Sequence, residues 1–517
     1  MGRVPAVRRT LIRSGLGAVL AACASMGSAQ QATSITTQPA ELRLGIERIT
    51  LPGSEHLGLV GGTYLLGLGH GIAFGPGAYG AISGQRGGLF VVGAELAWQH
   101  RLSGPLVLDA GFYFGGGGGG SAPVGGGLML RPHVDLLWDF GPFMAGVSAS
   151  QVRFANGSID SRQLGVVWAW KSEFRALQPG GAATDASANA SGIGIDRIDT
   201  FVASYRPRAS AKRLNGAALD GAIGLVGMRL ERRLSDHVFA GLEAAGAASG
   251  GVAGYAEALA TLGTETTVGS DALGSNAVGH DALGHDALRI GARVALGMGG
   301  GGRIDVGGGL LLSTELYGQW RIAPGLSVGL GAGLTRAPQG SFGATRWSAS
   351  LDWDLSGAAQ PLGGDGAASA VRTDWVGGAE RYRARRTDGS TRSLDAVILG
   401  ANRFITPQVY LSGQVHSGFA GDAGGYTVGL LGVGAQGNIW RAVGAGAELL
   451  VGAAGGGGVN TSGGAVMQPS IYLNAAVSPQ LALRVSAGRI KALRHGGTLD
   501  ATTLGASLVY SYGVSGS

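Results

Sequence analysis

The stretch TRWSASLDWDL, Thr345–Leu355, decides the fold, because its apolar and polar side chains alternate strictly. Alternation with a period of two is the pattern of a β-strand with two unlike faces. Trp347, Ala349, Leu351, Trp353 and Leu355 form the apolar face, and Arg346, Ser348, Ser350, Asp352 and Asp354 form the polar face. The apolar face is long and ends in aromatic residues, which is typical of strands that face lipid.

Two further stretches share this pattern, LGVVWAW at 164–170 and TLGASLVYSY at 503–512. Strands of about 10 residues match a tilted crossing of the hydrocarbon core. The composition agrees, because mean hydropathy is +0.21 and 14% of the residues are charged, against about 25% in soluble domains. Beyond the N-terminus no stretch of 18 apolar residues occurs, so the apolar residues are spread in alternation. In lipid, a closed β-barrel is the alternative to a helix, because every backbone group must be paired.

The N-terminal residues 1–29 have the form of an export signal, with four arginines before the short apolar core SGLGAVLAA. Two cleavage sites compete. Small residues precede a cut after Ala29, whereas LAAC at 20–23 resembles the lipobox of bacterial lipoproteins, in which Cys23 would be lipidated. Cys23 is the single cysteine, so the mature chain gains no stability from a disulfide in an oxidising compartment.

Three related modules follow, at 40–177, 195–356 and 371–513, each with a strand, a glycine run, a long strand, a short turn and another strand. Internal repeats of this kind indicate repeated structural units. We expect eight strands per module and therefore about 24 strands. Joints rich in glycine, alanine and serine separate the modules near 178–194 and 357–370.

Module two also contains an insertion at 264–288, which includes the near-repeated pentads GSDALGSNAVGHDALGHDAL at 269–288. Two pentads carry adjacent histidine and aspartate, His280–Asp281 and His285–Asp286. Histidine and aspartate are metal ligands, but we expect no metal site here, because this spacing on a glycine-rich segment fixes no coordination geometry. Tandem duplication of a short surface segment explains the pentads more simply.

With its export signal, amphipathic strands and alternating C-terminal strand, the chain resembles the Gram-negative outer-membrane β-barrel proteins over residues 40–513. The resemblance is to the class and to no named family. It implies location in the outer membrane, contact with outer-membrane lipid, insertion by the barrel-assembly machinery and, for an exporter, a secretion or export partner. Such proteins usually end on an aromatic residue, whereas this chain continues for five residues beyond Tyr512.

Two architectures fit an all-β transmembrane antiparallel barrel fold. The leading one is a single barrel of about 24 strands, whose wide lumen would be open, plugged or gated. The alternative is three tandem eight-stranded barrels, whose interiors side chains can fill. The first predicts a channel for a solute or polymer, without chemistry on the substrate. The second predicts a structural or surface-exposed anchor without an open channel.

Charged residues on strand faces are the candidates for a lumen wall, where arginine would attract anions. They are Arg43, Arg206, Arg208, Arg346, Asp352, Asp354, Arg381, Arg383 and Arg385. The other interpretation of the arginines places them at the rim, near lipid phosphates, where charge is tolerated. Net charge is +6, but no dense basic stripe with interleaved aromatics occurs, so we expect no nucleic-acid partner.

No catalytic site or cofactor is expected. The stretch GLSVG at 325–329 matches the pattern around the nucleophilic serine of hydrolases, but no helix is expected after Ser327, as that turn requires. The glycine runs at 115–120, 299–302 and 455–458 are predicted to be flexible loops. They cannot be phosphate-binding P-loops, because no glycine-lysine pair exists in the chain.

Overall fold

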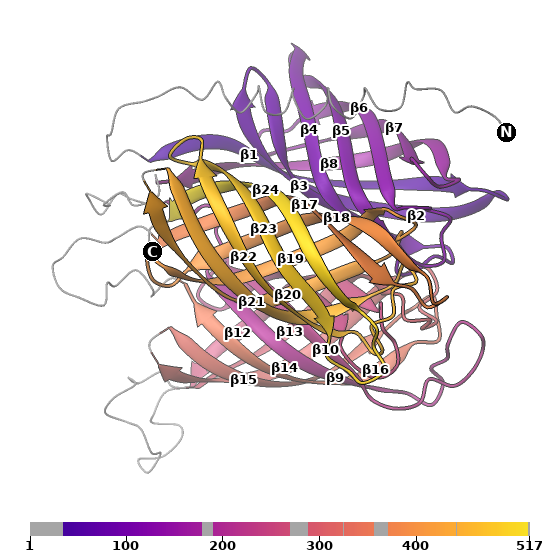
Figure 1. Ribbon diagram of the computed structural model, residues 1–517. Coiled ribbons are helices and arrows are strands. Elements are labelled where there is room, and N and C mark those ends of the chain that lie inside the picture. The colour runs from indigo at the N-terminus through magenta and orange to yellow at the C-terminus, as the bar shows by residue number, and fades with distance from the viewer. Residues whose placement is uncertain are drawn as a thin grey trace, which may run out of the picture. The chain divides into compact units, whose positions relative to one another are not determined.

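The computed structural model describes residues 35–177, 190–268, 288–323, 325–355, 371–440 and 442–514. The export signal with Cys23, the pentads and most of both module joints lie outside these residues. Within the described ranges every regular element is a β-strand, and no helix is long and apolar enough to cross a membrane. The strands form three closed antiparallel barrels of eight strands each (Figure 1).

Barrel 1 contains the first eight strands, joined in sequence order. They are β1 (Thr36–Leu51), β2 (Glu55–Gly69), β3 (Ile72–Ser83), β4 (Phe90–Ser103), β5 (Leu106–Gly118), β6 (Leu128–Asp139), β7 (Phe143–Phe154) and β8 (Asp160–Ala176). The barrel closes where β8 pairs with β1, with Trp170 opposite Leu42.

Barrel 2 contains the next eight strands and closes where β16 pairs with β9. They are β9 (Arg197–Pro207), β10 (Ile223–Arg233), β11 (Val238–Ala247), β12 (Ala256–Val268), β13 (Leu288–Gly300), β14 (Leu310–Ala323), β15 (Leu326–Arg336) and β16 (Gly343–Asp354). The pentads fall between β12 and β13.

Barrel 3 contains the last eight strands and closes where β24 pairs with β17. They are β17 (Val371–Arg385), β18 (Thr391–Phe404), β19 (Val409–Ala420), β20 (Thr427–Trp440), β21 (Val443–Gly455), β22 (Ala465–Ala476), β23 (Leu481–Ala492) and β24 (Asp500–Val514).

The fold therefore confirms the all-β class, the three modules of eight strands and the total of 24 strands. Of the two architectures, it has the alternative one, three separate barrels. The single wide barrel does not form because the last strand of each module pairs with the first strand of the same module. Each barrel thus satisfies its own edges, as lipid requires.

Alternation places the apolar face outward. On β16, Trp347 is 60% exposed whereas Arg346 is buried, which is the division of faces expected from TRWSASLDWDL. On β1, Leu42, Leu44 and Ile46 are exposed. An outer wall of large apolar side chains is costly in water and suited to a lipid environment.

The glycine runs are buried contacts and not the flexible loops expected from the sequence. Within Ile35–Ser517, which is one compact unit, the third strand of each barrel meets the fifth strand of another, with β3 against β13, β11 against β21 and β19 against β5. The end of the glycine run on each fifth strand lies against a glycine from the turn before a fourth strand. The pairs are Gly88 with Gly300, Gly254 with Gly455, and Gly425 with Gly118.

Backbone touches backbone at these three glycine pairs. A Cβ added to Gly88, Gly254 or Gly425 would lie 2.3, 2.8 or 2.8 Å from a backbone nitrogen of the other barrel, closer than real side chains approach. All three glycines have positive φ, where a Cβ is strained. The contacts are equivalent and lead from barrel 1 to 2, from 2 to 3 and from 3 back to 1, which is the closed ring of head-to-tail contacts found in threefold oligomers.

Candidate functional site in the barrel interiors

The interior of each barrel decides whether it can conduct. We call the end that carries the first and last residues of a barrel the terminal end, and the opposite end the loop end. At the loop end of every barrel the inward side chains form an apolar cluster. In barrel 1 this cluster includes Ile49, Leu57, Tyr113, Phe154 and Ile159, none more than 1% exposed. Because large apolar side chains pack against one another there, the loop end is closed.

Toward the terminal end, charged side chains fill barrel 1. The Arg43 guanidinium lies 2.9 Å from a Glu95 oxygen and 2.6 Å from an Asp109 oxygen. Arg131 pairs with Glu47 at 2.9 Å. The cavity among these groups measures about 10 Å³, which is roughly the space of one water molecule. Among the described residues, charged and polar side chains therefore fill this part of barrel 1 and leave little room for water.

Barrel 2 holds a larger network of the same kind. Arg229 donates to Glu243 at 2.6 Å and to Glu315 at 3.0 Å, and its guanidinium lies 4.2 Å from the centre of the Phe201 ring. Arg346 lies 2.7 Å from the other Glu243 oxygen. The network extends further through Arg197, Glu231, Glu265 and Arg293.

Barrel 3 relies more on hydrogen bonds from tyrosine, histidine and glutamine side chains than on arginine ion pairs. The Tyr410 hydroxyl bonds to Glu448 at 2.8 Å and to the Tyr472 hydroxyl at 2.7 Å. His416 uses both ring nitrogens, one with Glu380 at 2.7 Å and the other with Gln414 at 3.0 Å. Buried polar groups must be paired in this way because an unpaired one costs about 1–3 kcal/mol.

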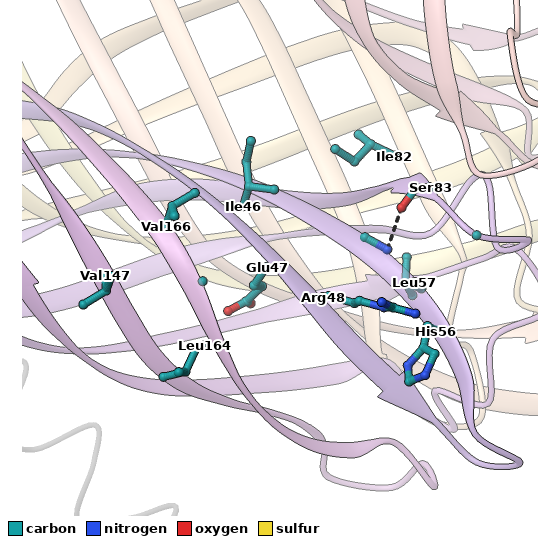
Figure 2. A pocket seen from close by; sticks show the side chains of 13 residues that line it. Ile46, Glu47, Arg48, His56, Leu57, Ile82, Ser83, Val147, Leu164 and Val166 are labelled. Atoms are coloured by element: carbon teal, nitrogen blue, oxygen red, sulfur yellow. Dashed lines mark hydrogen bonds between the residues drawn. The ribbon is translucent and has the colours of Figure 1, made fainter.

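A pocket of about 830 Å³ lies on barrel 1 (Figure 2). Its lining includes Ile46, Val147, Leu164 and Val166, which are 51–76% exposed and belong to the outward faces of β1, β7 and β8. The pocket is therefore a hollow that opens on the outer wall, at the place where β1 and β8 stop pairing beyond Glu47.

Four of the predicted lumen residues do point inward. Arg43 belongs to the barrel 1 network, and Arg346 and Asp352 are buried in barrel 2. Asp354 is partly exposed at the terminal end of β16, 4.0 Å from Arg289. All four line filled interiors, so they bind neighbouring side chains instead of forming a wall for solutes.

The other five predicted lumen residues are exposed, and their proposed orientation is wrong. Arg206, Arg208, Arg381, Arg383 and Arg385 all point outward or lie in a turn. The inward positions of these strands are taken by Tyr205 and Tyr382, which are buried, and side chains alternate between faces. The arginines of β17 lie next to the turn at 386–390, which matches the rim interpretation.

Most of the interior charge was not singled out from the sequence. Glu95, Asp109, Glu243 and Glu315 are each isolated acids in otherwise apolar or glycine-rich strands. The signal that could have revealed such residues is parity. In RPHVDLLWD, Arg131, His133 and Asp135 alternate with apolar residues, so all three must share one face.

Ser327 lies in strand β15, opposite Asp352 on β16. The strand continues beyond it to Arg336, so the strand-to-helix turn of a hydrolase nucleophile is absent at this position. The serine is part of the barrel wall.

No protein-family model and no curated protein matches this chain. Among solved structures, it is similar to a de novo designed transmembrane β-barrel, with 14% identity and a TM-score of 0.19, covering 28% of this chain and 94% of the other. It is also similar to the outer-membrane protein OpdK of Pseudomonas aeruginosa, with 12% identity, coverage of 92% and 98%, and a TM-score of 0.21.

The siderophore receptor PirA of Pseudomonas aeruginosa is similar as well, with 9% identity, coverage of 94% and 81%, and a TM-score of 0.28. These natural structures belong to the Gram-negative outer-membrane β-barrel class named from the sequence. At such identities and TM-scores the likenesses identify no substrate, and the function has to be argued from the interiors.

Proposed function

We propose that this chain is a membrane-anchored structural protein of three closed barrels, placed in a Gram-negative outer membrane to present its loop end. The observation that supports this is the filled interior. Each barrel combines an apolar cluster at the loop end with ion pairs or hydrogen bonds toward the terminal end. Eight strands give an interior just wide enough for side chains to fill.

The orientation we propose follows the usual asymmetry of such barrels, which have short periplasmic turns and longer outer loops. At the terminal end of barrel 1 the β2–β3 and β4–β5 turns are short, whereas a loop-end connection of barrel 2 has the length of the 208–222 segment. The connection at 269–287, which carries the pentads, is the exception, because it joins β12 to β13 at the terminal end. The apolar outer wall supplies the anchoring surface, and the loop ends supply the exposed one.

Conductance in planar lipid bilayers separates this proposal from the channel expected for a single wide barrel. We expect no stepwise current above that of the bare bilayer, because side chains of the described residues pack across each barrel interior. A trimeric porin inserted under the same conditions is the positive control. Reproducible steps from folded, heat-modifiable protein would contradict the proposal and favour a channel.

Lipidation of Cys23 stays a prediction of the sequence, because that residue lies outside the described range. If the LAAC motif is processed as a lipobox, labelling of growing cells with a radioactive fatty acid will mark the mature chain. The label is then expected to disappear in Cys23→Ser. Retained label in that variant, or none in the parent, would favour cleavage after Ala29.

A further inference from the structure

A buried cluster in barrel 1 contains several nitrogen and oxygen atoms that have no hydrogen-bond partner among the described residues. Asp109 on β5 and His133 and Asp135 on β6 place a carboxylate oxygen, an imidazole nitrogen and a second carboxylate oxygen within 4.8 Å of one another. All three residues are buried. Glu95 on β4 lies beside them, with an oxygen 3.4 Å from His133 Nε2.

The His133 side chain is fully buried, and neither of its ring nitrogens has a hydrogen-bond partner among the described residues. Asp135 Oδ1 and Glu95 Oε2 are also without a hydrogen bond there. Nδ1 lies 3.6 Å from Asp135 Oδ1, without the geometry of a hydrogen bond. One ring nitrogen of a histidine binds one metal ion, and the ligand atoms of Asp109, His133 and Asp135 lie close enough together to share one.

Charge gives an independent reason. Glu41, Glu95, Asp109 and Asp135 are four carboxylates that face the guanidinium of Arg43, so when all are ionised three negative charges remain. Arg131 is also nearby, but it pairs directly with Glu47 at 2.9 Å, so the negative charge stays in excess. A divalent cation would offset most of this excess, which is costly to leave in a low-dielectric interior.

The repeated architecture shows that this cluster is specific to barrel 1. Asp109 and Asp135 are direct cross-strand partners, an arrangement that is unfavourable for like charges. At the corresponding registers, barrel 2 pairs Gly291 with Tyr317, and barrel 3 pairs Gly446 with Tyr472. In both, the tyrosine ring covers the glycine. Barrel 1 replaces a neutral packed pair by two acids.

Space for the imidazole is also provided. Gly111 is the cross-strand partner of His133, and a Cβ at Gly111 would lie 2.3 Å from His133 Nε2. The ring therefore rests directly on the β5 backbone, with its nitrogens directed toward Glu95 and Asp135.

We propose that barrel 1 binds one divalent first-row transition metal ion through Asp109, His133 and Asp135. One imidazole with carboxylates is a ligand set for ions such as Zn²⁺ or Mn²⁺. The ion would neutralise excess charge and join β5 and β6 inside the barrel. This role is independent of whether the protein conducts.

The test uses the full chain, folded into detergent with ZnCl₂, dialysed and analysed by elemental mass spectrometry. We expect about one Zn²⁺ per chain, and a loss of roughly tenfold or more in affinity in His133→Ala and in Asp135→Asn. Asp135→Asn keeps the shape of the side chain, and heat-modifiability on gels verifies that each variant is folded.

Two control variants keep the test specific. His416→Ala removes a buried histidine of barrel 3 whose nitrogens are both bonded, and it should keep the ion. His280→Ala with His285→Ala removes the pentad histidines and should also keep it. A folded parent without stoichiometric Zn²⁺, or equal binding in His133→Ala, would overturn the proposal, as would loss of the ion with the pentad histidines.

Discussion

Arg229→Met is expected to lower the unfolding free energy of barrel 2 by about 3–5 kcal/mol, the usual cost of removing one partner from a buried ion pair. Arg229 is 1% exposed and holds Glu243 and Glu315 together. Methionine fills part of the space but leaves both carboxylates short of positive charge. Urea unfolding in lipid vesicles, followed by gel mobility without heating, measures the loss.

Arg381→Met is the matched control for this prediction. Arg381 makes an equally close pair with Asp395, but its side chain is 71% exposed, and exposed pairs contribute about 0–1 kcal/mol. In addition, Glu315→Gln should restore part of the stability lost in Arg229→Met, because it removes one of the two negative charges that Arg229 balances. Equal losses in Arg229→Met and Arg381→Met would show that the interior charges are solvated, and hence that barrel 2 is open to water.

Gly254→Val is expected to separate barrel 2 from barrel 3. Its added Cβ would lie 2.8 Å from the Gly456 nitrogen, and main chain cannot move aside as a flexible side chain can. A cysteine pair, Gly246→Cys with Ala453→Cys, reports the contact, because a Cβ at Gly246 would lie 3.1 Å from that of Ala453, near disulfide range. Disulfide cross-linking should be nearly complete in the variant that carries only this cysteine pair, and it should fall severalfold when Gly254→Val is added.

The control isolates the clash from backbone strain. Gly389 has φ of +83° but nothing within 4 Å of an added Cβ, so Gly389→Val bears a strain of about 1–3 kcal/mol without touching another barrel. We expect it to leave cross-linking unchanged. If Gly254→Val cross-links as fully as Gly389→Val, the contact between the glycine runs is not what holds these barrels together.

The fold was accessible from the sequence because alternation reports directly on which face meets lipid, as at Trp347 and Arg346. Strand count followed from the repeats. Closure did not follow, because it depends on whether Trp170 pairs with Leu42 or with a later module, a long-range choice that local pattern leaves open. In RYRARR, alternation groups the three arginines on one face, but it does not decide whether that face meets the lumen or the rim, and the structure exposes it.

The candidate metal site was hidden for a related reason. Asp109 and Asp135 are 26 positions apart in the sequence, and only the register of β5 on β6 makes them partners. The composition of the glycine runs predicts flexible loops. Their contact with another barrel cannot be predicted from composition, because a glycine in the sequence does not indicate which backbone packs against it.

The head-to-tail glycine contacts have a consequence for how such a ring can change over time. A ring built from three separate copies carries every substitution three times and falls apart when diluted. Here the linkers fix the stoichiometry and keep the effective concentration of each barrel for the next one high. The interior side chains of one barrel can therefore differ from those of the other two, as they do in barrel 1 at Asp109 and His133, while the glycine contacts of all three barrels are kept.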